Sequence, residues 1–93
     1  MNWSLSLIIK IIGECTDSYG LPTLELIKKY NAFLEKECVS VEYSDKIRYN
    51  YSMQYRIKQL RNEGLVEPSG AYKLTKKGKI VYQQIIQTSW QDW

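Results

Sequence analysis

Histidine is absent from this chain, and the sequence has few of the patterns that enzymes and metal proteins need. Without histidine, the chain lacks the commonest general base and the commonest metal ligand. Its only two cysteines, Cys15 and Cys38, stand too far apart in the sequence for the spacing of a zinc site. There is also no nucleophile motif and no glycine-rich phosphate loop. These absences argue against an enzyme, so we expect no catalytic residue, no metal and no cofactor.

A long uninterrupted apolar run is also missing. The most apolar stretch, LSLIIKII at residues 5–12, contains Lys10 and is too short to span a bilayer. It has neither the basic flank nor the small-residue cleavage site of a secretory signal. We therefore expect an intracellular, cytoplasmic protein without membrane contact. With 44% hydrophobic and 25% charged residues, the 93-residue chain should form one ordered domain, residues 1–93.

The charge that is present is unevenly distributed. The net charge is +3, but residues 1–44 hold four Lys/Arg and six Asp/Glu, whereas residues 45–93 hold nine Lys/Arg and four Asp/Glu. A basic field on one part of a protein suits a polyanionic partner. The alternative is a solvated basic face that has no partner, and the charge alone does not decide between the two.

The first half of the chain predicts two helices. Residues 3–14 place apolar side chains at helical spacing. A loop over residues 16–22 follows, in which Leu21 is a candidate for a short edge strand. Thr23 can cap a second helix over residues 24–37. The apolar stripes of the two helices contain Leu5, Ile8, Ile9 and Ile12, and Leu24, Ile27, Tyr30 and Leu34.

The second half begins with a segment of mixed signals. Residues 38–50 alternate like a strand in VSVEY but also contain helix-capping residues, so we interpret them as an irregular connection. A helix over residues 51–63 follows, with Asn50 or Ser52 as its cap, and Gly64 should end it. Its apolar stripe contains Met53, Ile57 and Leu60.

A hairpin and a last helix complete the expected fold. Leu65 and Val66 are strand-like, residues 68–70 have turn chemistry, and residues 71–74 alternate in polarity. Thr75 should cap a last helix over about residues 76–90, within a C-terminal segment 76–93 that we assign to dimer contact. We therefore expect a mostly α fold with a small β-hairpin.

The same residues carry a family resemblance. LRNEGLVE, a short turn and YKLTKKGK, within residues 60–79, resemble the winged helix-turn-helix of multiple-antibiotic-resistance-type regulators. GLPTLELIKK, residues 20–29, resembles the segment that opens the second helix of that family. TLELIKKYNA, residues 23–32, and LTKKGK also resemble small winged-helix proteins encoded by viruses of hyperthermophilic archaea. The resemblance implies a winged-helix transcription regulator, and in the narrower case a viral protein acting in its host cell.

Residues 51–63 would then form the helix that enters the major groove of double-stranded DNA. A face of polar and basic side chains lies opposite the apolar stripe, as reading base edges requires. We expect Gln54, Tyr55 and Gln59 to touch bases. Ser52, Arg56 and Lys58 would hold phosphates. The complete set of expected DNA contacts is Tyr51, Ser52, Gln54, Tyr55, Arg56, Lys58, Gln59, Lys73 and Lys76. The competing interpretation is an ordinary solvated helix face.

The C-terminal helix has more apolar surface than a small domain needs, which predicts a homodimer. The expected interface residues are Trp3, Leu7, Tyr82, Ile85, Ile86 and Trp90. The helix over residues 24–37 is about 21 Å long and separates the two cysteines, which disfavours a bond within one chain. In a mesophilic cytosol both cysteines should be free thiols, whereas in a hyperthermophile Cys15 and Cys38 are candidates for an intersubunit disulfide.

Two rival functions remain open. The chain could be a winged-helix module that binds proteins and not DNA, with its basic half merely solvated. Alternatively, Tyr49, Tyr51 and Tyr55 interleave with basic residues in a way that suits stacking on single-stranded nucleic acid. We assign Tyr30, Tyr72 and Tyr82 to the core. Steep salt dependence of binding to duplex DNA would separate a DNA-binding protein from a protein-interaction module.

Overall fold

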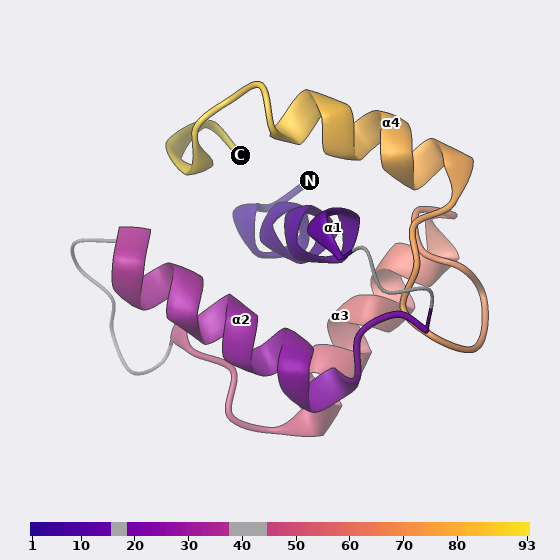
Figure 1. Ribbon diagram of the computed structural model, residues 1–93, viewed down its shortest axis with the longest axis horizontal. Coiled ribbons are helices and arrows are strands. Elements are labelled where there is room, and N and C mark those ends of the chain that lie inside the picture. The colour runs from indigo at the N-terminus through magenta and orange to yellow at the C-terminus, as the bar shows by residue number, and fades with distance from the viewer. Residues whose placement is uncertain (16–18, 38–44) are drawn as a thin grey trace.

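The computed structural model describes residues 1–15, 19–37 and 45–93, which form a helical fold (Figure 1). In chain order its elements are α1 (Trp3–Glu14), α2 (Thr23–Glu37), α3 (Asn50–Asn62), α4 (Lys76–Ile85) and a short 3₁₀ helix, η2 (Trp90–Asp92). The helices expected at 3–14, 24–37 and 51–63 are confirmed to within one residue at each end.

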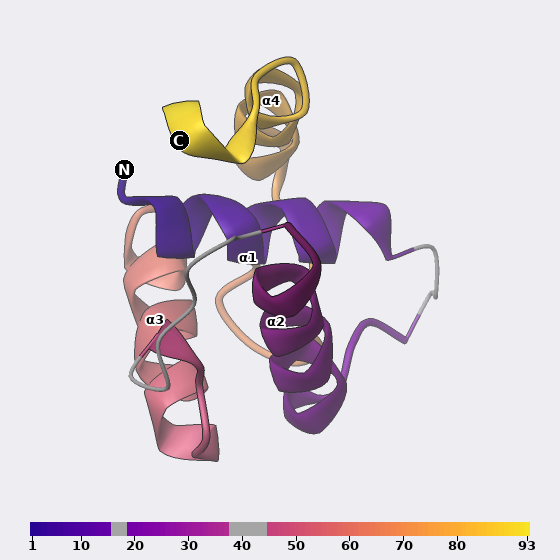
Figure 2. The same cartoon turned by 90° about the vertical axis from the view of Figure 1, so that its left-hand side faces the viewer.

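Helix α1 lies in the middle of the molecule. Figure 2 shows α4 on one side of it and α2 and α3 on the other. The apolar stretch of α1 has side chains on every side of the helix, and such a helix has to be covered all round. The buried residues of α1 are Leu5, Ser6, Leu7, Ile8, Ile9, Ile11 and Ile12. The core is therefore built around α1.

Helices α2 and α3 each bury one stripe of side chains and leave the rest in solvent. The buried residues are Leu26, Ile27, Tyr30 and Leu34 on α2, and Met53, Ile57 and Leu60 on α3. The stripe expected on α3 is confirmed, whereas Leu24 on α2 is exposed. The side chain of Asn31 on α2 donates from Nδ2 to the carbonyl of Ile47 at 2.8 Å. It also accepts from the Ile47 N–H at 2.9 Å, so one amide holds the segment that leads into α3.

The end of α3 has the geometry that its sequence predicts. Gly64 has a φ of +75°, a conformation that glycine adopts without steric cost. The N–H of Gly64 donates to Arg61, and the N–H of Leu65 donates back to Leu60 at 2.9 Å. These two bonds form a Schellman motif, in which Leu65 is buried beside Leu60. Gly64 therefore ends α3 as expected.

The prediction of a β-hairpin after α3 is wrong. In the described part of the chain, only one pair within residues 65–75 forms an antiparallel bridge, Val66 with Leu74, and it is isolated. The Glu67 N–H donates to Lys73 and the Thr75 N–H donates to Leu65. These bonds flank a single residue pair, and Pro68 and Gly70 on the connecting turn leave no room for a second pair. The fold of the described residues is helical, not a winged helix with a hairpin.

The last helix is also shorter than expected, because α4 ends at Ile85 and not near residue 90. The hydroxyl of Thr88 and the indole N–H of Trp93 both donate to the Ile85 carbonyl, at 3.0 and 3.3 Å. The chain then turns back through η2, and the Trp93 ring stacks on Phe33 of α2 at 5.7 Å. The C-terminal segment thus covers part of its own chain. Thr75 does cap α4, since its side chain accepts from the Gly78 N–H.

None of the helices in the described ranges is long and apolar enough to cross a bilayer. Of the irregular connection expected at 38–50, residues 38–44 lie outside the described residues, as does Cys38. Leu21, the candidate edge strand, forms one isolated antiparallel bridge with Tyr72.

Candidate nucleic-acid interface

The solvent face of α3 is the candidate site. Because Met53, Ile57 and Leu60 point into the core, the side chains between them face outward. Tyr51 and Tyr55 are 68% and 64% exposed, which is unusual for side chains of their size. The other exposed residues of this face are Gln54, Lys58, Gln59 and Asn62. The face therefore combines aromatic rings, amides and one ammonium group.

Two residues expected on this face, Ser52 and Arg56, are only partly exposed. The Nε of Arg56 donates to Ser4 Oγ on α1 at 3.1 Å. Its second bond goes to the Ser52 carbonyl at 2.9 Å. Ser4 is in turn hydrogen-bonded to the buried hydroxyl of Tyr30 at 2.7 Å. Arg56 thus links α3 to α1, and Ser52 is itself half-buried.

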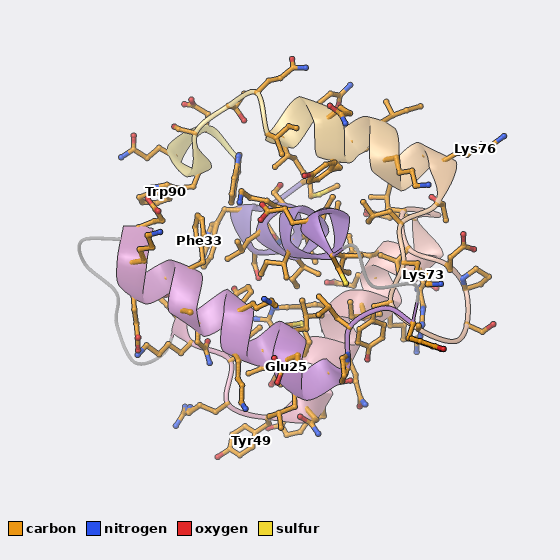
Figure 3. All side chains as sticks on the ribbon, viewed as in Figure 1. Glu25, Phe33, Tyr49, Lys73, Lys76 and Trp90 are labelled. Carbon is orange, nitrogen blue, oxygen red and sulfur yellow. The ribbon has the colours of Figure 1, made fainter. Side chains whose placement is uncertain are left out.

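The start of α3 carries an aromatic cluster. The rings of Tyr49 and Tyr51 stack with centroids 5.4 Å apart and planes 10° from parallel. The guanidinium of Arg48 lies over the Tyr49 ring, 5.8 Å from its centroid. Figure 3 shows Tyr49 projecting from the edge of the molecule. We call Arg48, Tyr49 and Tyr51 the aromatic platform. Arg48 was not among the expected DNA contacts, although its place beside two tyrosines was a visible signal.

Tyr49 also occupies the N-cap position of α3, in place of the expected Asn50 or Ser52. Its backbone is extended and its side chain makes no capping hydrogen bond. A helix start without a Ser, Thr, Asn or Asp cap forgoes about 1 kcal/mol of stability. A residue with a capping side chain would stabilise the helix at this position. The Tyr49 side chain instead stacks on the ring of Tyr51.

Lys73 and Lys76 lie near the opposite end of α3. Both are exposed, and Figure 3 shows them on the same side of the molecule, where α4 begins. The start of α4 is tied to the end of α3, because Lys77 Nζ donates to the Glu63 carbonyl at 3.0 Å and Thr75 Oγ1 donates to the Gly64 carbonyl. The Glu63 carbonyl is at the negative end of the α3 dipole, which favours a lysine there.

Three exposed lysines near α3 and the start of α4 have no acidic partner among the described residues. Ion pairs elsewhere in the described ranges join Lys10 to Glu14, Lys28 to Glu25 and Lys46 to Glu35. Within the same ranges, Lys58, Lys73 and Lys76 form no ion pair. Their charges are therefore not neutralised by neighbouring carboxylates in this part of the structure.

Arg61 organises the turn between α3 and α4. Its guanidinium donates to the carbonyls of Glu67 and Gly70, at 2.7 and 2.8 Å. It also lies over the ring of Tyr72, 5.3 Å from the centroid. The Tyr72 hydroxyl reaches Thr23 at the start of α2, at 2.8 Å. The turn is thus held against both α3 and α2.

The residues expected at a dimer interface are divided between core and surface. Leu7 and Ile85 are buried within the single chain, so neither is available to a second subunit. Trp3 is 38% exposed and stacks on Tyr30 with centroids 6.2 Å apart. Ile86 is 44% exposed. The remaining two residues, Tyr82 and Trp90, are partly buried.

The three tyrosines assigned to the core do contact it. Tyr30 is fully buried, and Tyr72 and Tyr82 pack against the core while partly exposed. Cys15 is a free thiol of intermediate exposure at the end of α1.

Among the described residues, no group of three or more Cys, Asp or Glu side chains is placed to hold a metal ion. Comparison of the chain with protein-family models, with curated proteins and with solved structures finds no match. A function for this chain therefore has to be inferred from its own geometry.

Proposed function

We propose that this protein binds double-stranded DNA through the solvent face of α3 and regulates transcription by occupying its site. The observation that carries the proposal is the division of α3 into a buried apolar stripe and an exposed face of amides, rings and a lysine. A helix fits the major groove of B-DNA, where base edges offer donors and acceptors to polar side chains.

Different residues on the face serve different parts of the duplex. Gln54 and Gln59 are exposed amides, and glutamine can bind adenine through two hydrogen bonds at once. Lys58 supplies charge to the phosphate backbone, which positions the protein without reading sequence. Lys73 and Lys76 add phosphate contacts beyond the end of α3. Arg56 acts differently, because its bond to Ser4 fixes the helix on α1.

The test is binding to duplex DNA at several salt concentrations. We expect log affinity to fall linearly with log salt concentration, because phosphate contacts release counterions. Lys58→Ala should weaken binding to all sequences alike and reduce that slope by about 1. Lys36→Ala on α2 is the matched control, because it removes the same charge from an exposed helix position outside the face. Equal effects of the two substitutions, or an affinity insensitive to salt, would refute binding through α3.

The recognition of particular DNA bases is tested by a separate substitution. Gln59→Ala should cost about 1–3 kcal/mol at one base position and leave the salt slope unchanged. A set of duplexes in which each position of a selected site is varied in turn measures this effect. A uniform loss at every position would remove Gln59 from the base contacts.

We also propose that the protein acts as a homodimer paired through α4. Ile80 on this helix and Ile86, the residue directly after it, are exposed apolar side chains, at 62% and 44%. Since α4 lies on the far side of α1 from α3, such pairing leaves the solvent face of α3 open (Figure 2). Sedimentation equilibrium should give the mass of two chains, and Ile86→Glu should shift the protein to monomer. A monomer at every concentration would refute the dimer.

A further inference from the structure

We propose that the aromatic platform at the start of α3 binds unpaired nucleobases of single-stranded nucleic acid. Tyr51 remains 68% exposed although Tyr49 covers one face of its ring. Its second face is therefore open to another flat ring. Every nucleobase has such a face, and stacking on protein aromatics is largely independent of base identity.

The charge beside the rings suits the same ligand. The Arg48 guanidinium lies over the ring of Tyr49, at the side of the platform. A single strand carries a phosphate between successive bases, so a guanidinium next to a stacking surface can contact the backbone of a stacked base. Asn50, also exposed, adds an amide at the same helix start. Rings, a cation and an amide within four consecutive residues are the components of a short single-strand site.

The local structure also favours a binding role over a structural one. The N-cap position of a helix normally stabilises the helix through a short polar side chain, but Tyr49 makes no such bond. Tyr49 is 53% exposed and does not belong to the core. Positions at which a locally unfavourable residue gains no core packing are those where function is expected.

This site does not depend on the proposed duplex binding. A base inside a duplex is stacked on both faces and cannot lie on Tyr51, so the platform selects unpaired bases. Tyr55 is the internal comparison: it lies on the same helix and is 64% exposed, but it has no ring partner among the described residues.

The experiment measures fluorescence anisotropy with labelled homopolymers about 12 nucleotides long, one of deoxythymidine and one of uridine, which do not form duplexes with themselves. We expect the wild-type protein to bind at least one. Tyr51→Ala should weaken binding by roughly 5- to 150-fold, and Tyr51→Phe should retain affinity within about twofold, since it keeps the ring. Tyr55→Ala should have a smaller effect than Tyr51→Ala. The tighter homopolymer identifies DNA or RNA as the source of the bases.

Tyr49→Ser separates binding from folding. A serine restores a capping side chain while removing the ring, so the melting temperature should stay within a few degrees of wild type and single-strand affinity should fall. Absence of binding to both homopolymers would overturn the proposal, as would equal losses for Tyr51→Ala and Tyr55→Ala. If homopolymers bind and duplex DNA does not, the platform stands and the duplex proposal fails. If duplex DNA binds and the homopolymers do not, the platform proposal fails and the duplex proposal stands.

Discussion

The two ends of α3 are built in opposite ways. At its C-terminal end, Gly64 makes a Schellman motif, and Lys77 and Thr75 donate to the backbone carbonyls of Glu63 and Gly64. At its N-terminal end, Tyr49 leaves the cap position without a side-chain hydrogen bond and exposes its ring. One end holds the helix in the fold, and the other presents side chains to solvent. We infer that stability is concentrated at the C-terminal end and ligand contact nearer the N-terminal end.

The largest effect on stability should come from Gly78→Ala. A Cβ at this position would overlap the backbone carbonyl oxygen of Leu65, which cannot move without disturbing the end of α3. We expect the free energy of unfolding to fall by about 3 kcal/mol. Urea unfolding of the variant measures this loss. Gly70→Ala, at a turn position where no atom lies near the added carbon, should cost less, because only the strain of its positive φ remains. An equal loss for the two variants would contradict the close approach of Gly78.

A smaller loss is expected for Gly64→Ala. No atom lies within 4 Å of an added Cβ, so the cost is only that of a positive φ for a residue with a side chain. That cost is about 1–2 kcal/mol. Gly64→Asn should lose less than Gly64→Ala, because asparagine tolerates this conformation better. The thermal midpoints of the two variants measure the difference, and a reversed order would show that φ is not the cause.

The smallest change in stability belongs to Tyr49→Ser at the other end of the helix. Its unfolding free energy should lie within about 0.5 kcal/mol of wild type, because the new capping bond offsets the lost ring stack. The comparison of the two helix ends would fail if this variant lost as much stability as Gly78→Ala. Chemical unfolding of both proteins under the same conditions decides the point.

Local signals predicted the helices well. The spacing of Met53, Ile57 and Leu60 is enough to define a buried stripe. Gly64 and Thr75 are residue types that commonly end and begin helices, and each does so here. These features depend on a few neighbouring residues, so the sequence contains them directly. The function remains a prediction, because the exposed face of α3 is compatible with more than one polyanionic ligand.

Features that depend on distant residues were not predictable in the same way. The segment after α3 has strand-like residues, but within it only Val66 and Leu74 pair with each other, and Tyr72 pairs instead with the distant Leu21. The end of α4 depends on the Ile85 carbonyl meeting the indole of Trp93, which in turn stacks on Phe33 of another helix. From the sequence, Arg56 is expected to bind phosphate, but in the structure it donates a hydrogen bond to Ser4 of α1. Each of these features depends on contacts between residues that are far apart in the sequence, so only the folded structure reveals it.

The paired hydrogen bonds between Asn31 and Ile47 have a consequence for the chemical ageing of the protein. Deamidation of Asn31 would replace its donating NH₂ group with an oxygen, leaving the Ile47 carbonyl opposite a negative charge. One bond would be lost and a repulsion introduced at the segment that enters α3. Slow hydrolysis at a single amide on α2 would thus loosen the aromatic platform from a distance, without altering any residue that we assign to nucleic acid.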